Sequence, residues 1–309
     1  MKLHNSRSSA SGRPTVGVPG LQGVNPHWIV PNWPAPPGVK AVFTTRHGGV
    51  SPAPFDSMNM GDHVGDTPML VAANRALLSQ AVGGRAVFLQ QVHGTQVASL
   101  QPHTPDGGVA DACVTAERHV ACTIMVADCL PVLLATRCGT LVGAAHAGWR
   151  GLAGAHAPGT ASPGPEDAPQ SVLTAIFKAF DALAQAFTAC DATDLIAWLG
   201  PCIGPQAFEV GAEVKAAFEA TQDDAANCFV AGGFGKFLAN LPALARGRLR
   251  ALGLGDAQIY GNDSSARWCT ASNPSHFFSH RRDTRVIGQD VAHVGVNSTG
   301  RMAACIWKT

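Results

Sequence analysis

Three side chains that bind metals well stand at or beside the ends of short apolar stretches. They are His93, Cys129 and His146. Two imidazoles and one thiolate suit a zinc ion, and three protein ligands leave one coordination position open for Lewis-acid chemistry. The residues alone also allow a second interpretation, in which the three are unrelated and Cys129 only fills a small gap in the core.

The same residues fit a cysteine hydrolase as well. Cys129 would be the nucleophile, His146 its base, and Asp128 or a backbone carbonyl would orient the imidazole. In a metal site, Asp128 could instead carry protons or orient a ligand. Cys129, His146 and Asp128 are therefore the catalytic candidates, and the sequence does not choose between their roles.

Arginines in or near glycine-rich turns form a second candidate group. Arg46 begins the turn at residues 46–51, Arg150 follows Trp149 in another turn, and Arg281 lies near the C-terminus. A guanidinium can hold phosphate or carboxylate through two parallel hydrogen bonds. We expect Arg46, Arg150 and Arg281 to bind an anionic substrate group, with ordinary surface charge as the alternative. Trp149 beside Arg150 would offer a flat aromatic surface or pack in the core.

The apolar stretches around Cys129 and His146 have the length and composition of strands. Residues 120–126, 131–135 and 141–145 are rich in Val, Leu and Ala and are bounded by turn residues. Runs of this kind favour strands that are buried on both faces of a sheet. Cys129 and His146 would then be held rigidly at strand ends, where they could face a cleft.

The remainder of the chain alternates between strands and helices. The helix at residues 171–188 has apolar residues at helical spacing, and Thr67 and Asn240 are expected to cap two others. Residues 28–37, with two Trp among prolines, predict an extended arm docked on the body. We expect further strands at residues 39–45, 87–92, 96–100, 195–199 and 302–307, and further helices at residues 67–82, 209–220 and 240–252.

The composition is that of a globular protein with little charge. Of 309 residues, 46% are hydrophobic and 14% are charged, and the net charge of +1 gives no basic stripe for nucleic acid. No apolar run predicts a membrane span or a signal peptide. The 9 cysteines are scattered and odd in number, which argues against a disulfide framework and for a reducing compartment. We expect a cytoplasmic protein, and the sequence leaves the oligomeric state open.

Two regions are predicted along the chain. Residues 1–23 are rich in Ser, Gly and Pro and predict a mobile extension, whereas residues 24–309 predict one domain. Within that domain, residues 155–170 and 284–298 have the composition of inserted loops.

Eight stretches of the chain match, in order, the motifs of one known family. The chain resembles the laccase-domain group, which is named after multicopper polyphenol oxidases and is also called the YfiH type, from about residue 31 to the C-terminus. The matching stretches are TTRHGGVS (44–51), QQVHGTQV (90–97), ADCLPVLL (127–134), HAGWRGLAG (146–154), LGPCIGPQAFEVG (199–211), CT (269–270), FFSHRRD (277–283) and TGRMAACIW (299–307).

The resemblance implies a fold, a metal site and an activity. The family fold is α+β, a single layered α/β/β/α unit with mixed sheets, similar to that of cytotoxic necrotizing factor toxins. The family's metal ligands fall on His93, Cys129 and His146. The implied function is zinc-dependent phosphorolysis of adenosine, inosine, guanosine and methylthioadenosine with phosphate, together with adenosine deamination.

Two other functions follow from the same resemblance. One is an amide hydrolase that edits peptidoglycan precursors. The other is a copper-dependent polyphenol oxidase, which ranks last because the chain lacks the HxH pairs of multicopper sites, so Cu²⁺ ranks behind Zn²⁺ as the metal. The chain departs from the family pattern at residues 1–23, 155–170 and 284–298, and it has His280 where the family usually has Tyr. These departures leave the substrate preference open.

Overall fold

The computed structural model describes residues 24–154, 170–187, 194–286 and 298–309. The predictions for the extension at residues 1–23, for residues 155–169 and for residues 287–297 lie outside the described residues.

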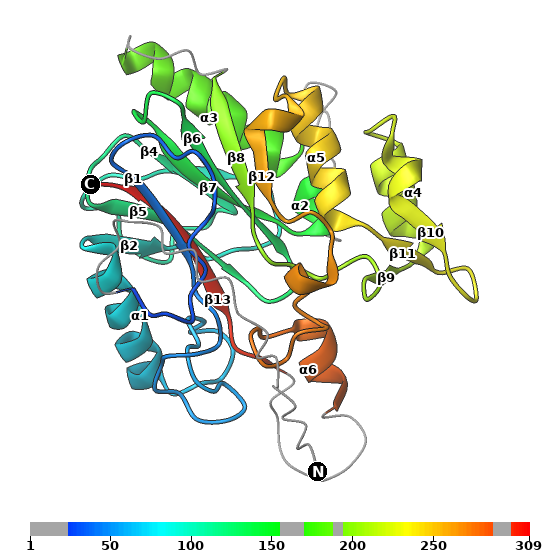
Figure 1. Cartoon of the computed structure of the whole chain (residues 1–309), viewed down its shortest axis with the longest axis horizontal. Helices are drawn as coiled ribbons and strands as arrows, with labels where there is room; N and C mark the ends of the chain where they lie inside the picture. Colours follow the sequence, from blue (N-terminus) through cyan, green and yellow to red (C-terminus); the bar gives the residue numbers. More distant parts are fainter. Residues whose placement is uncertain (1–23, 155–169, 188–193, 287–297) are drawn as a thin grey trace, which may run out of the picture.

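Two mixed sheets form the centre of the fold (Figure 1). The smaller central sheet has the order β1-β13-β5-β2, with β2 parallel to β5 and the other pairs antiparallel. Its strands are β1 (Val39–Phe43), β2 (Arg85–Phe88), β5 (Val120–Val126) and β13 (Met302–Lys308).

The larger central sheet has the order β12-β8-β6-β7-β4-β3, with parallel pairs only at its two edges. Its strands are β3 (Val97–Ser99), β4 (Ala112–Thr115), β6 (Leu130–Thr136), β7 (Val142–Ala147), β8 (Leu195–Leu199) and β12 (Ile259–Gly261). A third, small sheet joins β9 (Glu209–Val210), β10 (Phe229–Ala231) and β11 (Phe237–Ala239).

Alternating side chains divide the apolar core into three layers. Leu133 and Ala135 of β6 pack between the two central sheets, together with Phe43 and Ile124 of the smaller one. Their neighbours on the strand point the other way, toward helices. This period of two is what a strand buried on both faces requires, and every residue of β5, β6 and β7 is buried as predicted.

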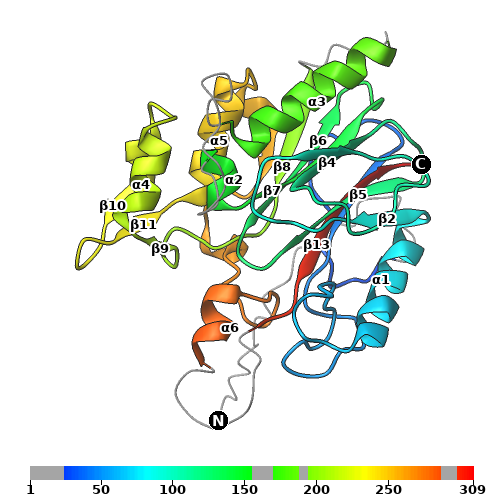
Figure 2. The ribbon, with the colours of Figure 1, turned by 180° about the vertical axis from the view of Figure 1, so that it is seen from behind.

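Helices cover the outer face of each central sheet. The helix α1 packs on the smaller sheet through Leu78 and Val82, whereas α2, α3 and α5 pack on the larger one and α4 packs beside the third, small sheet (Figures 1 and 2). The predicted α/β/β/α layering of an α+β fold is therefore confirmed. The helices are α1 (Pro68–Val82), α2 (Trp149–Ala153), α3 (Val172–Phe187), α4 (Ala212–Glu219), α5 (Leu241–Ala251) and α6 (His280–Val286), with 3-10 turns at Ala225–Cys228, Asp256–Gln258 and Ala266–Trp268.

Four predicted elements differ from the structure. The strand expected at residues 87–92 ends at Phe88, and the one expected at residues 96–100 is β3, which belongs to the other central sheet. The helix expected at residues 209–220 is a short strand followed by α4, because Gly211 between them has extended backbone. Residues 284–286, expected to lie in a loop, extend α6 instead.

The predicted arm at residues 28–37 lies on the body, where Ile29 exchanges two backbone hydrogen bonds of 2.8 Å with Phe43. In the described part of the chain, seven cysteines are free and Cys138 is disulfide-bonded. The sequence argues against a disulfide framework, and Cys138 departs from that expectation because it forms a disulfide bond. None of the described helices combines the length and the apolar character needed to cross a bilayer.

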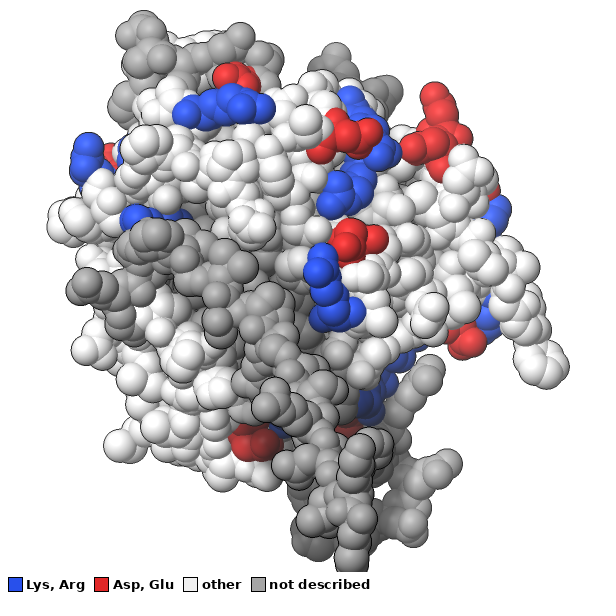
Figure 3. All heavy atoms as spheres, in the orientation of Figure 1, with Lys and Arg blue, Asp and Glu red and all other residues white. Residues whose placement is uncertain are grey.

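Charged side chains are sparse and mixed in sign on the face drawn in Figure 3. Lys and Arg lie beside Asp and Glu there, without a broad patch of one sign. This face has no cluster of positive charge of the kind that nucleic-acid binding needs.

Two helix starts offer a matched test of the capping prediction. The side chain of Asn240 accepts a hydrogen bond from Ala243 N (3.1 Å), whereas Thr67 occupies the N-cap position of α1 without such a bond. We expect Asn240→Ala to lower the free energy of unfolding by about 0.5–2 kcal/mol in urea denaturation. Thr67→Ala should change it by much less. Equal losses in both variants would contradict this account of helix capping.

Candidate metal centre

Two chain crossings between the central sheets bring the predicted ligands together. After β5, the chain turns at Asp128 and Cys129 and enters the larger sheet as β6. The segment from β2 to β3 makes the same change of sheet and carries His93. His93 and Asp128 have positive φ angles of 61° and 91°, so both crossings depend on a backbone conformation that few non-glycine residues adopt.

His146 reaches the same place from inside a strand. It lies in β7, opposite Pro131 of β6, and therefore near Cys129. Its strand neighbours Ala145 and Ala147 belong to the helix-facing core, so its side chain points toward the other sheet. The prediction that His146 ends a strand is wrong by one residue, because β7 continues to Ala147.

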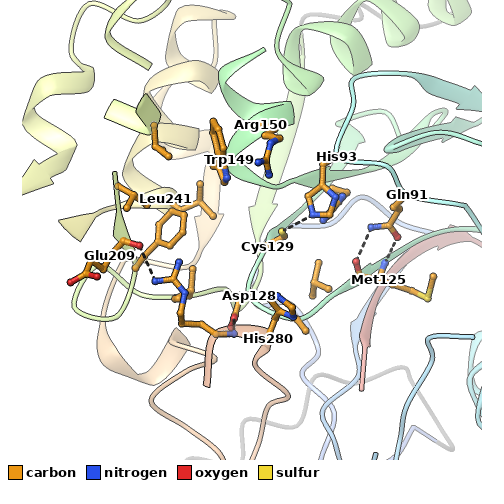
Figure 4. Close-up of a pocket in the computed structure, with 18 of the residues that line it drawn as sticks. Gln91, His93, Met125, Asp128, Cys129, Trp149, Arg150, Glu209, Leu241 and His280 are labelled. Carbon is orange, nitrogen blue, oxygen red and sulfur yellow. Dashed lines mark hydrogen bonds between the residues drawn. The ribbon is translucent and has the colours of Figure 1, made fainter. Parts of the chain in front are cut away.

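The three ligand atoms lie close enough to bind one ion. They are within 4.8 Å of one another, and Cys129 Sγ is 3.7 Å from His93 Nε2 (Figure 4). The two imidazole rings meet edge to face with centroids 4.8 Å apart. His146 is buried, Cys129 is half-buried and His93 is exposed, so the group opens to solvent on one side.

One buried carboxylate, that of Asp111, fixes two of the ligands. Its Oδ1 accepts from His146 Nδ1 (2.8 Å) and from His93 N (2.9 Å), and its Oδ2 accepts from Gly94 N (2.7 Å) and Val92 N (3.1 Å). Because a carboxylate only accepts, Nδ1 of His146 carries the proton and Nε2 is left to bind a metal. Burial alone would raise the pKa of Asp111, but these bonds lower it, so the carboxylate is ionised.

The residues present fit a zinc ion. The donor set is soft, the second ring nitrogen of His146 is anchored, and Gly148 leaves the necessary space. A Cβ atom on Gly148 would lie 3.0 Å from both Cys129 Sγ and His93 Cδ2. A larger residue at this position would therefore press on two of the three ligands.

The charges within the group favour the deprotonated thiol. Burial alone would raise the pKa of Cys129, but His146 and His93 outweigh it and lower the pKa to about 6. Burial alone would lower the pKa of His146, whereas the negative charges of Cys129 and Asp111 raise it to about 9. At neutral pH the metal-free pair is therefore a thiolate beside an imidazolium, and the thiolate is the form that binds metal or attacks a substrate.

The group lies in the wall of a cavity of about 700 Å³ (Figure 4). Trp149 and Arg150 of α2 line it near the ligands, and Arg301, which precedes β13, also lines it. Part of the wall is apolar and comes from the region of the small sheet, from α4 and from the start of α5. Its residues are Phe208, Val210, Val214 and Leu241.

The three predicted anion-binding arginines lie in different surroundings. Arg150 lines the pocket with its guanidinium carbon 4.5 Å from the centre of the Trp149 ring. Arg281 also lines it, but its Nη1 donates to Glu209 O (2.8 Å). The structure does not bring Arg46 to the pocket, because its guanidinium pairs with Asp56 (3.2 Å), donates to a carbonyl and stacks on a phenylalanine.

Asp128 lines the pocket, but its carboxylate is already engaged. It accepts from Thr270 Oγ1 (2.5 Å), Ser279 Oγ (3.1 Å) and Arg281 N (2.6 Å). The carboxylate therefore anchors the start of α6. The hypothesis that Asp128 orients His146 is wrong, because Asp111 makes that contact.

Sequence reasoning missed two residues of the site. Asp111 and Arg301 were not singled out, although Arg301 stands in the TGRMAACIW stretch that carried the resemblance. Asp111 gives no local signal, because its partner His146 is 35 residues away and reaches it only through the pairing of β4 with β7.

A family model described as multi-copper polyphenol oxidoreductase laccase matches residues 40–309. The chain belongs to this family. The resemblance found in the sequence is thereby confirmed.

Named relatives cover nearly the whole of this domain. A purine nucleoside phosphorylase of Pseudomonas aeruginosa is 41% identical over 281 residues, which are 91% of this chain and 98% of the relative. The purine nucleoside phosphorylase YfiH of Escherichia coli is also 41% identical, over 90% of this chain and 98% of its own length. These family members support the prediction that the chain is an enzyme.

Solved structures agree with the fold. A Neisseria meningitidis protein has a TM-score of 0.71 and 40% identity, covering 91% of this chain and 99% of its own. YlmD from Geobacillus stearothermophilus has a TM-score of 0.69 and 30% identity, covering 88% and 92%.

The role of Asp111 can be tested through metal affinity. Asp111→Asn removes the charge that holds His146 and should weaken zinc binding by about 10- to 100-fold in a titration against a competing chelator. Asp56→Asn, which removes a carboxylate outside the pocket, should leave the affinity unchanged. Equal zinc affinity in the wild type and a folded Asp111→Asn protein would contradict the positioning role.

The lowered pKa of Cys129 predicts unusual thiol reactivity. In metal-free protein, alkylation of Cys129 by iodoacetamide should rise through pH 6 and level off above it, because the thiol with a pKa of about 6 is then fully ionised. His146→Gln should move the midpoint upward. Peptide mass spectrometry would follow Cys129 alone, and a wild-type midpoint near that of an ordinary thiol would refute the thiolate–imidazolium pair.

Proposed function

We propose that the protein is a zinc-dependent purine nucleoside phosphorylase acting on adenosine, inosine, guanosine or methylthioadenosine. The observation that carries this proposal is the composition of the pocket, in which the ligand group shares one cavity with an apolar wall and several arginines. A nucleoside needs an apolar surface for its base, and phosphate needs positive charge. The names of the relatives at 41% identity support the same activity.

The pocket residues have distinct parts in the proposed reaction. The wall of Phe208, Val210, Val214 and Leu241 would hold the base, and Trp149 could stack on it. The pocket arginines would hold phosphate beside the ribose. A phosphate oxygen forms a bond to the anomeric carbon, while the bond from that carbon to the base breaks and the base leaves with the electron pair. Holding both substrates in line would supply most of the rate through orientation.

His93, Cys129 and His146 would hold the zinc ion. When bound, zinc supplies a Lewis acid at the edge of the pocket. Copper ranks behind it because the described part of the chain offers a single group of three ligands and no cluster of the multicopper kind. We further propose that the protein works in the reducing cytoplasm, which the seven free thiols among the described residues support and the disulfide bond of Cys138 does not.

A second candidate rests on the ionised thiol of Cys129. With a pKa of about 6 and an imidazolium beside it, Cys129 resembles the nucleophile of a cysteine hydrolase. An amide hydrolase that edits peptidoglycan precursors would form a covalent acyl-cysteine. Such an adduct is detectable by mass spectrometry and has no place in phosphorolysis.

Product identification separates these functions. We expect zinc-loaded protein to convert adenosine to adenine and ribose 1-phosphate only when phosphate is present, because phosphate is the attacking group. Formation of inosine and ammonia would report the deaminase activity that accompanies this proposal. Absence of ribose 1-phosphate with every purine nucleoside tested, together with an acyl-enzyme from an amide substrate, would replace this proposal with the hydrolase.

Cys129→Ala links the reaction to the metal. The variant should lose most of the zinc, about one ion per chain in the wild type, because two imidazoles alone bind it weakly. Phosphorolysis should fall with the zinc content measured by atomic emission. Full zinc occupancy in a folded Cys129→Ala protein would contradict the ligand assignment.

A further inference from the structure

Arg301 is a pocket arginine whose charge has no carboxylate partner among the described residues. It lines the cavity beside the ligand group, yet the ion pairs formed in the described ranges do not include it. The negative groups whose charges act on its guanidinium are Cys129 and Asp128, both in the wall of the same cavity. A half-buried cation of this kind favours the binding of an anion.

The backbone of Arg301 is held at two points by the segment after β1. Arg301 N donates to Asn59 Oδ1 (2.9 Å), and Met60 N donates to Arg301 O (2.9 Å). Asn59 is fully buried and donates in turn to Asp66 Oδ2 (2.9 Å), while Asn74 donates to Asn59 O (2.9 Å). This buried polar network fixes the position of Arg301 before any ligand arrives.

The side chain of Arg301 is held in place by its neighbours, but one edge of its guanidinium has no hydrogen-bond partner among the described residues. A Cβ atom on Gly61 would lie 2.8 Å from Arg301 Cγ, so Gly61 is packed directly against the stem. In the described part of the chain, the guanidinium donates only through Nη1, to Thr299 O (2.6 Å) and Gly300 O (3.4 Å). The Nε and Nη2 edge can therefore bind two oxygen atoms of an oxyanion.

The charge of Arg301 acts on two histidines of the cavity. Burial lowers the pKa of His63 and of His280, and the charge of Arg301 lowers both further. Both histidines line the same cavity. The lowered pKa values favour neutral imidazoles near the arginine.

We propose that Arg301 binds the phosphate co-substrate beside the metal ligands, an inference that rests on the proposed phosphorylase function. The alternatives predicted from sequence are less suited. Arg46 lies outside the pocket, and Arg150 is stacked on its neighbouring tryptophan. The contact of Arg281 with a carbonyl oxygen is exposed to solvent, whereas the carbonyl contacts of Arg301 are partly buried. Arg301 combines a position in the cavity, a fixed backbone and an unused guanidinium edge.

The test compares variants in two assays on zinc-loaded, full-length protein. One assay titrates inorganic phosphate into protein calorimetrically, and the other measures the KM for phosphate and for the nucleoside. Arg301→Gln should raise the Kd and KM for phosphate about 10- to 100-fold, because a bidentate charged contact is lost. The KM for the nucleoside should change much less.

Three further variants sharpen the comparison. Arg301→Lys keeps the charge without the planar fork and should give an intermediate phosphate KM. Gly61→Ala keeps the arginine but displaces its stem, so it should also weaken phosphate binding. Arg267→Gln removes an arginine whose side chain is 70% exposed and lies outside the cavity, and it should behave as wild type.

The outcomes separate this inference from the function on which it rests. If wild-type protein makes ribose 1-phosphate and Arg301→Gln and Arg301→Lys keep its phosphate KM within about threefold, the inference is overturned and the phosphorylase stands. If the wild type binds phosphate, Arg301→Gln does not, and no nucleoside is cleaved, the anion site stands and the phosphorylase is overturned. An unfolded Arg301→Gln protein would shift the decision to Arg301→Lys and Gly61→Ala.

Discussion

The site depends on the four hydrogen bonds that the Asp111 carboxylate accepts. Three of them come from the backbone of residues 92–94 and one comes from His146, so a single buried charge sets both the turn that carries His93 and the tautomer of His146. The bond from His146 N to Asp111 O (2.7 Å) ties the same residue to β7. Loss of this carboxylate would release two of the three candidate ligands together.

The layered fold determines where the Asp111 carboxylate and the ligand group lie. Two central sheets share a dry core, and the chain crosses between them twice on the side where the ligands meet. The helices α2 and α4 and the small sheet then add an outer wall, so that the ligand group opens into a cavity instead of bulk solvent. Ligands set on packed strands and on turns with positive φ angles lose little further entropy when they bind a metal.

Much of the fold and part of the site were predictable from the sequence. Short apolar runs predict the buried strands β5, β6 and β7, and the motifs around His93, Cys129 and His146 indicate the family and the candidate ligands, which the structure brings together. The predictions that failed depend on which residues meet in the folded chain. Asp111 contacts His146 only because β4 and β7 are neighbours in the sheet. Arg46 lies in a turn whose composition suits anion binding, but its guanidinium pairs with Asp56, ten residues away. A local pattern cannot report which partner a charged side chain finds in the folded chain.

The most direct test of the central claim is anomalous diffraction at the zinc edge from crystals of the metal-loaded protein. The account predicts one strong peak about 2.0–2.1 Å from the nitrogens of His93 and His146 and about 2.3 Å from Cys129 Sγ, with His146 bound through Nε2. The hydrogen bond from Nδ1 to Asp111 should be retained in that structure. A peak held by other residues, or ligation through Nδ1 of His146 with Asp111 released, would contradict it.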